Sequence, residues 1–421
     1  MCNDSRKSEP EPVAPVKKCC TRLLAQSPRL VLAAIAFGSN GIAHAQTGTF
    51  LDRQWPSDLR IADYNVNWDS IFPDNDPNNH SFRCCNKVAE FRRLIAAINP
   101  DIMTLQEING SRPVSDVTAI FNDVLPLPGG ASWHGAIGYN NVTVSRWPLS
   151  MIATQTTPAG DLPRVMVLVD LPNDRFARDL YIINEHFKCC SGATNDNRRQ
   201  KQADSIIAWL RDARTAGGSI TLPTGTPMLV LGDLNIVGSL APLNTVLCGD
   251  ISNNTTYGPD SPPDWDASCS TDVHPLHNLV GPADYTWRED GSGFDPGRLD
   301  YAIYTDTAIN AAKKLVLNTV TMTTSELAAN GLQQYDVVLS PPGGYDHLPL
   351  VIDFRLTVPV PANGDVNLDA AVNGGDIDWF VRLITTGPAN DPLRIAKGDF
   401  SGNGLVDAAD ISGFVSALIG M

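Results

Sequence analysis

Polar side chains that could hold a metal ion or move a proton stand at the ends of short apolar runs in this sequence. Asn65, Glu107 and His186 each follow such a run, and the segment Gly-Asp-Leu-Asn at 232–235 follows the apolar residues 228–231. Ligands of open α/β sheets bind outside the carboxyl ends of the strands. If these runs are strands, we expect the polar groups to gather at one edge of a sheet.

Two further polar groups precede apolar runs instead of following them. Asp300 directly precedes the run 301–304, and the pair Asp346-His347 shortly precedes the run 350–354. Strands that run antiparallel to the others would bring these starts to the same edge. Each residue taken singly has an ordinary explanation, since Gly, Asp and Asn favour turns and a lone histidine is commonly structural. The prediction of one site therefore depends on the complete ordered set.

The residue types in this set suit the hydrolysis of a phosphate ester. A phosphodiester is anionic and resists attack by hydroxide, and a divalent cation neutralises its non-bridging and leaving oxygens. Mg²⁺ prefers oxygen ligands, usually one or two carboxylates together with water. An imidazole that is held by a carboxylate has a fixed tautomer and a greater basicity. Carboxylates, amides and imidazoles at one sheet edge therefore indicate metal-assisted phosphoester chemistry.

The ordered set resembles the motifs of the endonuclease/exonuclease/phosphatase superfamily. The matching segments, in chain order, are Tyr64-Asn65, Leu105-Gln106-Glu107, Asn184-Glu185-His186, Gly232-Asp233-Leu234-Asn235, Arg298-Leu299-Asp300-Tyr301 and Asp346-His347-Leu348-Pro349. The resemblance extends over about 59–356, and Gly-Asp-x-Asn followed by Asp-His-x-Pro is its most specific part. The sequence departs from the family at Tyr345, where serine is usual, and the family's substrate-contacting Tyr or Arg positions are not assigned. Neither departure removes a catalytic group.

The resemblance implies an α/β fold, a four-layered sandwich of two packed mixed sheets flanked by helices. It also implies a phosphodiester hydrolase that depends on Mg²⁺ or Mn²⁺. Glu107 is the first choice of metal ligand, with Asn65 and Asp346 near it. These three residues are our predicted metal ligands.

The resemblance further assigns roles to the remaining polar residues. Asp233 and Asn235 would orient the attacking water or the phosphate, and they could hold a second metal ion. His347 would act as the general base, with Asp300 or Asp233 as its carboxylate partner. His186 would stabilise the charged transition state as a hydrogen-bond donor or general acid.

The substrate stays open at this point. A phosphodiester, in particular nucleic acid, is the leading interpretation, and a sphingomyelinase, a phospholipase C-like enzyme or a phosphomonoesterase is the alternative within the family. The net charge of -15 gives no general attraction to a polyphosphate backbone, so nucleic acid would be bound through a local patch or a metal ion. A non-catalytic scaffold protein is a third interpretation, but no group of the set is missing. A glycosidase is disfavoured because it needs two opposed carboxylates and has no use for these motifs.

The elements that would position these groups alternate between apolar runs and amphipathic stretches, which indicates an α/β protein. Phe91, Leu94, Ile95 and Ile98 have helical spacing in the stretch 88–98, and Asn99-Pro100 ends that helix. A second helix is predicted at 202–210, and 253–275 is predicted to be an irregular loop. Strands are predicted at 60–65, 102–105, 165–171, 180–184, 228–231, 301–304 and 350–354.

After a short Pro/Gly linker at 358–364 the composition changes to Asp, Asn, Gly and Ala, and a twelve-residue pattern occurs twice. Its members are Asp365, Asn367, Asp369, Ala371, Asn373 and Asp376 in the first copy, and Asp399, Ser401, Asn403, Leu405, Asp407 and Asp410 in the second. This spacing is typical of loops that wrap around one Ca²⁺. An apolar helix is predicted after each loop, at 377–384 and 411–419.

The repeated loops resemble a type I dockerin, with Asp in place of Glu at the twelfth position. The resemblance implies a small all-α calcium-loop domain over 359–421 and a cohesin-type partner domain. In the first loop Ala370 replaces the glycine that is usual at position six, so we expect a strained turn. A purely stabilising role and an Asp/Gly-rich linker that binds nothing remain as alternatives.

The N-terminal residues 1–45 have the pattern of an export signal. A positive flank precedes the apolar stretch 30–37, and Ala43-His-Ala45 supplies the small residues that a signal peptidase recognises. The stretch is too short to span a bilayer, and no other segment is long enough. We therefore expect a secreted or cell-surface protein whose main domain covers 46–358.

The cysteines agree with export, since six of the nine lie outside the signal. Cys248 and Cys269 are a plausible local disulfide. The adjacent pairs at 84–85 and 189–190 could cross-link to each other and stiffen the rim of the site. Zinc binding is the alternative, but no C-x-x-C spacing supports it.

Overall fold

The computed structural model describes residues 49–154, 164–341, 343–356, 362–369, 371–386 and 391–420. The predicted signal peptide, the first part of the predicted linker and Ala370 lie outside the described residues. Within them, no helix is long and apolar enough to cross a bilayer.

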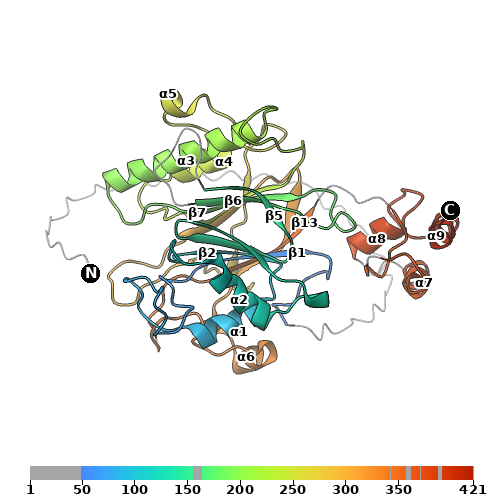
Figure 1. Cartoon of the computed structure of the whole chain (residues 1–421), viewed down its shortest axis with the longest axis horizontal. Coiled ribbons are helices and arrows are strands. Elements are labelled where there is room, and N and C mark those ends of the chain that lie inside the picture. The colour runs from blue at the N-terminus through green and yellow to red at the C-terminus, as the bar shows by residue number, and fades with distance from the viewer. Residues whose placement is uncertain are drawn as a thin grey trace, which may run out of the picture. The chain divides into compact units, whose positions relative to one another are not determined.

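Two mixed β-sheets form the main body of the chain (Figure 1). In the described residues the first sheet contains, in spatial order, β10 (Leu276–His277), β12 (Ile309–Val316), β13 (Leu350–Leu356), β1 (Leu59–Asn65), β2 (Ile102–Gln106), β4 (Asn141–Ser145) and β3 (His134–Gly138). The second sheet contains β5 (Leu149–Ala153), β6 (Arg164–Val169), β7 (Leu180–His186), β8 (Met228–Asp233), β11 (Asp300–Tyr304) and β9 (Thr271–Asp272).

The strand directions bring the predicted polar groups to one edge. β1 runs parallel to β2, and β7 runs parallel to β8. β11 runs antiparallel to β8 with Asp300 opposite Asp233, and β13 runs antiparallel to β1 with Leu350 opposite Asp63. The expectation that two strands would start where the others end is confirmed.

The two sheets pack face to face through one continuous core. Along β6, Val165, Val167 and Val169 belong to the core that is shared with the first sheet, whereas Met166 and Leu168 belong to a second core that contains α3 residues. This alternation follows from the two-residue period of a strand. One face of β6 is therefore buried against the first sheet and the other against the layer of α3.

Helices cover the outer face of each sheet (Figure 1). The helices α1 (Val88–Ile98), α2 (Val114–Val124) and α6 (Thr324–Asn330) lie on the side of the first sheet, and α3 (Ala193–Ala213) and α4 (Ala241–Cys248) lie on the side of the second. Two packed mixed sheets flanked by helices confirm the predicted α/β sandwich. Helix α1 has the predicted bounds and buries the four predicted apolar residues, and it ends at Asn99 in the left-handed conformation.

Other elements differ from the sequence prediction. α3 begins nine residues before the predicted helix, because its first half is polar and carries no apolar period. The predicted irregular segment 253–275 contains the short helix α5 (Asn254–Tyr257) and strand β9. The strands β3, β4, β5 and β12 were not predicted.

One predicted disulfide is confirmed and the other is wrong. Cys248 is bonded to Cys269. The cross-link that the two adjacent cysteine pairs could form is absent, because Cys84 is bonded to its neighbour Cys85. In the second pair, the sulfur atoms of Cys189 and Cys190 lie 2.8 Å apart. No cysteine belongs to a group of potential metal ligands in the described chain.

The C-terminal segment has a small hydrophobic core of its own. It contains α7 (Asp376–Thr386), α8 (Pro392–Gly398) and α9 (Ile411–Leu418), so two helices follow the repeated loops as predicted. The rings of Phe380 and Phe414 are stacked with centroids 3.8 Å apart. The domain boundary and the calcium-loop character of this segment stay predictions.

Candidate active site

The predicted polar residues meet at the sheet edge where β1, β2, β7 and β8 end. Asn65 is the last residue of β1, His186 of β7 and Asp233 of β8, while Asp300 is the first residue of β11. Glu107 directly follows β2. Both sheets contribute, so the site spans the sandwich at one end.

Asp233 is the residue that most of the others contact. Its Oδ2 atom lies 3.2 Å from the amide nitrogen of Asn65 and 2.8 Å from that of Asn235. The Nε2 atoms of His186 and His347 lie 3.4 Å and 3.5 Å from the same oxygen. Burial raises the pKa of Asp233 well above its ordinary value, although the charge of His347 opposes this rise. One buried carboxylate thus joins groups from both sheets.

His347 is held by Asp300. The Nδ1 atom of His347 lies 3.0 Å and 2.8 Å from the two oxygens of that carboxylate. The hydroxyl of Thr286 accepts hydrogen bonds from the backbone N–H groups of Leu299 and Asp300, which fixes the carboxylate in turn. Burial opposes protonation of His347, but the charges of Asp300, Asp233 and Asp346 together raise its pKa well above its ordinary value.

The pKa of His186 is shifted in the opposite direction to that of His347. The amide nitrogen of Asn140 lies 2.8 Å from Nδ1 of His186, so Nδ1 accepts and the proton of the neutral ring is on Nε2. Burial, with further contributions from the charges of His347 and Lys188, lowers the pKa of His186 to about 3. The neutral ring therefore directs an N–H donor toward Asp233 and toward Glu107, whose Oε1 is 3.9 Å away.

The predicted metal ligands form a second group beside Asp233. Burial, followed by the negative charge of Asp346, raises the pKa of Glu107 to about 7, while His347 and a hydrogen bond from Asn65 lower it. Asp346 accepts hydrogen bonds from Trp287 Nε1 at 3.1 Å and from Asn67 Nδ2 at 2.8 Å. Two partly buried carboxylates that repel each other next to an amide oxygen fit a hard divalent cation, which would relieve the repulsion.

A different trio has the most compact geometry for a metal. In the described residues, ligand atoms of Asp233, Asp300 and His347 all lie within 4.8 Å of one another, and no other such trio of His, Cys or carboxylate ligands occurs there. This trio and the group of Glu107, Asp346 and Asn65 are therefore alternative sets of metal ligands. Asp300 is already paired with the imidazole of His347, so this trio needs no cation to balance its charge. We therefore retain Glu107, Asp346 and Asn65 as the predicted ligands.

Several supporting residues had no role assigned from the sequence, although Gln106 and Gly232 belong to the matching segments. Gln106 donates hydrogen bonds to Asp63 at 2.7 Å and to Asn184 at 2.9 Å, which links the two sheets directly behind the site. Gly232 has a φ of 131°, and a Cβ atom there would lie 2.0 Å from the carbonyl oxygen of Glu185. The neighbouring strands β7 and β8 can approach this closely only with glycine at that position. Asn140 stands in the turn between β3 and β4, and no sequence motif marks it.

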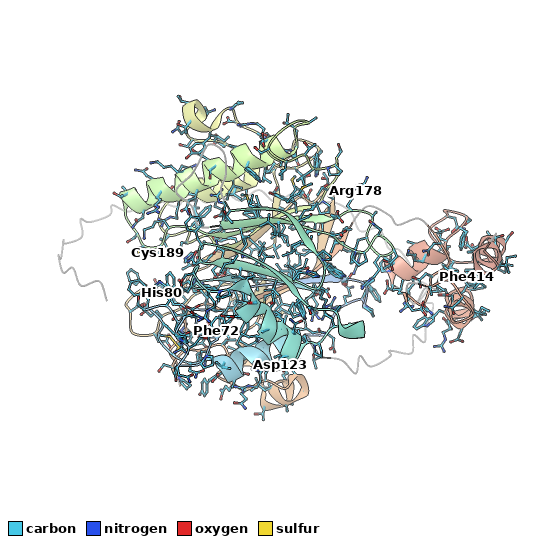
Figure 2. All side chains as sticks on the ribbon, viewed as in Figure 1. Phe72, His80, Asp123, Arg178, Cys189 and Phe414 are labelled. Atoms are coloured by element: carbon cyan, nitrogen blue, oxygen red, sulfur yellow. A yellow bond between two sulfur atoms is a disulfide. The ribbon has the colours of Figure 1, made fainter. Side chains whose placement is uncertain are left out.

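Aromatic side chains stand beside the catalytic groups. Trp68 lines a pocket of about 250 Å³ together with Glu107 and His186, and also a neighbouring pocket of about 350 Å³ together with His80 and Tyr139. The rings of Trp68 and His80 are stacked with centroids 4.1 Å apart, and Phe82 extends the row at 5.0 Å from His80. His80 is labelled in Figure 2. We call Trp68, His80 and Phe82 the aromatic ledge.

The backbone of the aromatic ledge is tied to the predicted metal ligand. Residues 67–69 have φ values of 49°, 46° and 63°, and Glu107 has a φ of 63°. The N–H group of Asp69 donates to the carbonyl oxygen of Glu107 at 3.0 Å, and the carboxylate of Asp69 accepts from the N–H group of His80 at 2.7 Å. Left-handed backbone at non-glycine residues is costly and often marks functional sites. Here it places the aromatic ledge and Glu107 together.

Comparison with known proteins identifies the family of this chain. The model of the endonuclease/exonuclease/phosphatase family matches residues 64–321, more than half of the chain. No curated protein matches.

Solved structures also match over most of the chain. A humanized D. rerio TDP2 is 15% identical with a TM-score of 0.43, over 71% of this chain and 99% of that one. The human Nocturnin catalytic domain is 17% identical with a TM-score of 0.42, over 72% and 95%. The Neisseria 3′ phosphatase NExo is 15% identical with a TM-score of 0.40, over 70% and 99%.

The contact between His347 and Asp300 predicts an unusual titration. In the metal-free protein, NMR of the imidazole protons should give His347 a pKa well above its ordinary value, because three carboxylates favour its charged form. Asp300→Asn removes the nearest charge and should lower that pKa by about one unit or more. An unchanged His347 titration would contradict the pairing.

Proposed function

The chain belongs to the endonuclease/exonuclease/phosphatase family and is a metal-dependent phosphoesterase, and on this basis we propose that it hydrolyses phosphodiester bonds in nucleic acid. One observation carries the proposal most directly. Two imidazoles approach the same buried carboxylate, Asp233, next to the acidic pair Glu107 and Asp346, and their surroundings shift the pKa of His186 down and that of His347 up. Groups whose pKa values are driven apart in this way are typical of acid–base sites.

The proposed roles follow from the contacts around Asp233. Glu107, Asp346 and Asn65 would hold Mg²⁺ or Mn²⁺. The cation would supply charge neutralisation at the phosphate oxygens. Asp233, held by the amide of Asn235, orients the attacking water. His347, held at Nδ1 by Asp300, receives the proton at Nε2 in its neutral form, which a bound cation would favour by offsetting the charges of the surrounding carboxylates. His186 remains neutral and donates its Nε2–H to the charge that develops on the phosphate.

The aromatic ledge supports nucleic acid as the substrate class. Single-stranded nucleic acid is commonly bound by aromatic side chains on which bases stack. Trp68 shares a pocket with Glu107 and His186, and Phe82, at the other end of the row, is 71% exposed. Since the chain carries a net charge of -15, stacking and the metal ion would have to replace general attraction to the phosphate backbone.

We also propose that the protein is exported and carries a calcium-dependent tethering module. The support for export is the N-terminal sequence pattern and the Cys248–Cys269 disulfide. N-terminal sequencing of exported protein tests this, because a mature chain that still begins at Met1 would contradict signal cleavage. A cohesin-type domain is the proposed partner of the module, by its resemblance to dockerins.

The support for calcium loops is a repeated hydrogen-bond pattern. Asp376 accepts from the backbone N–H groups of Asn367 and Asn373 at 3.0 and 2.9 Å. Asp410 accepts from those of Ser401 and Asp407 at 2.7 and 2.8 Å. The twelfth residue of each loop thus binds the third and the ninth in both copies. This folds each loop back on itself, as a loop that surrounds a cation requires.

Removal of the catalytic groups tests the proposed activity. His347→Ala and Glu107→Gln should each lower kcat by at least about 10²-fold, because they remove the proton acceptor and a metal ligand. The assay uses single-stranded DNA, RNA, bis-p-nitrophenyl phosphate, a phosphomonoester and sphingomyelin with Mg²⁺. His134→Ala and Glu90→Gln change the same residue types away from the site and should retain activity.

The outcomes separate the parts of the proposal. Parental activity in both site variants would refute the assignment of the site. Hydrolysis of only the monoester or only sphingomyelin would refute the nuclease proposal while the family's chemistry stands.

Shortening the exposed end of the aromatic ledge tests base stacking. Phe82→Ala should raise KM for single-stranded DNA about tenfold, because one stacked base is lost. Activity on bis-p-nitrophenyl phosphate, which lacks a base, should not change. Ile377→Ala removes an exposed apolar side chain of the C-terminal segment and serves as the control. Equal loss on both substrates would contradict the stacking role.

Calorimetric titration of the full chain with Ca²⁺ tests the repeated loops. Two binding events are expected, and Asp365→Asn and Asp399→Asn should each abolish one, since each removes a negative charge from the first position of a loop. Asp378→Asn changes an exposed carboxylate of α7 outside the loops and should retain both. A parent that releases no heat with Ca²⁺, or equal loss in all three variants, would refute the calcium loops.

A further inference from the structure

A cavity of about 510 Å³ lies at the other end of the sandwich from the catalytic groups. Arg60 near the start of β1 and Asp101 just before β2 line it, whereas Asn65 and Glu107 stand at the opposite ends of these strands. Five residues of extended strand separate Arg60 from Asn65, which corresponds to about 17 Å. The cavity is therefore distinct from the site described above.

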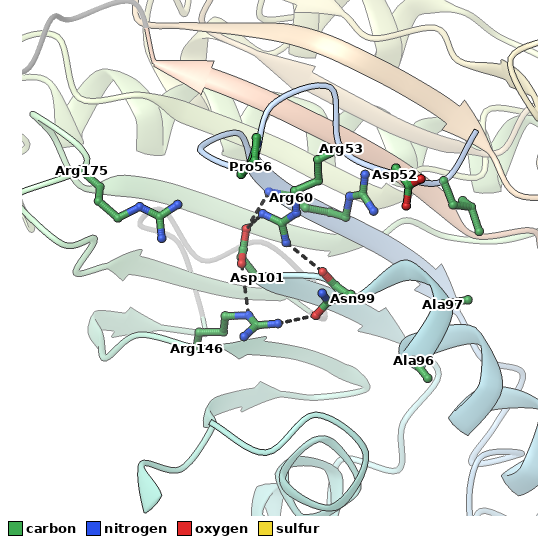
Figure 3. Close-up of a pocket in the computed structure, with 11 residues that line it drawn as sticks. Asp52, Arg53, Pro56, Arg60, Ala96, Ala97, Asn99, Asp101, Arg146 and Arg175 are labelled. Atoms are coloured by element: carbon green, nitrogen blue, oxygen red, sulfur yellow. Dashed lines mark hydrogen bonds and ion pairs between the residues drawn. The ribbon is translucent and has the colours of Figure 1, made fainter. Parts of the chain in front are cut away.

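Four guanidinium groups line this cavity, those of Arg53, Arg60, Arg146 and Arg175 (Figure 3). Asp52 and Asp101 are the two carboxylates among the lining residues. Such a concentration of arginine is unlike the chain as a whole, whose net charge is -15.

The carboxylate of Asp101 is already fully engaged. Its Oδ2 atom accepts from Arg53 Nη1 and from the backbone N–H of Arg60, at 2.5 and 2.9 Å. Its Oδ1 atom lies 3.1 Å from Nε of Arg146. The side chain of Arg60 is paired with Asp353 through two hydrogen bonds of 2.6 and 2.8 Å. Both oxygens of Asp101 are therefore already paired with groups other than Arg175.

Arg175 is the guanidinium group without a hydrogen-bond acceptor. Within the described part of the chain its side chain forms no hydrogen bond or ion pair, its Nε atom is buried, and its guanidinium carbon lies 5.4 Å from the centre of the Phe176 ring. Figure 3 shows its side chain extending toward Asp101 and Arg146 from the far side of the cavity.

The positive charges of Arg53 and Arg175 lower the pKa of Arg146, after the larger effect of burial. Arg146 donates from Nε to the carbonyl oxygen of Pro100 and from Nη2 to Asn99, and these bonds leave its Nη1 available. An unsatisfied guanidinium group beside a partly engaged one fits an anion in the space between them.

We propose that this cavity binds a phosphate-bearing ligand, with Arg175 and Arg146 as the main contacts. Guanidinium groups match phosphate oxygens with paired N–H donors. The apolar residues Leu51, Pro56 and Ala97 line the rest of the cavity and would contact an organic group attached to the phosphate. The volume is within the usual range for small-molecule sites, so a nucleoside monophosphate fits as well as inorganic phosphate.

Binding of inorganic phosphate and of AMP to the full chain tests the proposal. Calorimetry in EDTA excludes metal-dependent binding at the catalytic site. The parent should bind one equivalent, and Arg175→Gln should weaken the affinity about tenfold or more, because one charge-assisted donor is lost. Arg178→Gln replaces an exposed arginine three residues further along the chain and should bind like the parent (Figure 2).

A second variant separates this site from the proposed activity. Glu107→Gln alters the catalytic site alone and should leave phosphate binding unchanged, whether or not the chain proves to be a nuclease. Tighter binding of AMP than of phosphate would show that the apolar wall contributes. No binding by the parent, equal loss in Arg178→Gln, or loss in Glu107→Gln would each overturn the proposal.

Discussion

The carboxylate of Asp233 is buried where the two sheets end, and a buried carboxylate is tolerated only when polar partners surround it. Those partners are Asn65 from the first sheet, Asn235 from the loop after β8, and the imidazoles of His186 and His347. Their approach requires both sheets to end at the same level. Three features bring the sheet ends to this level. They are the packing of the two sheets, the antiparallel direction of β11 and β13, and the hydrogen bonds of Gln106 between the sheets.

The sequence predicted the structure correctly where the chemistry requires a particular residue type or where apolar residues recur at a regular spacing. The predicted catalytic and metal-binding residues meet at one edge, although their individual roles stay predictions, and α1 has the predicted bounds because its apolar residues follow a clean helical period. The first half of α3 was missed since its polar residues carry no such period. Asn140 was missed because only the three-dimensional fold brings its amide to His186.

The cysteines illustrate a different limit. Counting and export context predicted the Cys248–Cys269 bond, which joins two ends of one irregular segment. Connectivity between adjacent pairs cannot be derived from sequence, because it depends on distances between loops. The same limit applies to the arginine cavity, whose four cationic side chains come from three separate parts of the chain and show no motif.

The close approach of β7 and β8 at Gly232 also restricts how the protein can diverge. Any side chain at this position would push against the carbonyl of Glu185, and the displaced strands carry His186 and Asp233 at their next residues. A single methyl group would thus shift two functional side chains without altering either of them. Among relatives that retain activity, this glycine should be as invariant as the acid that follows it, although it performs no chemistry.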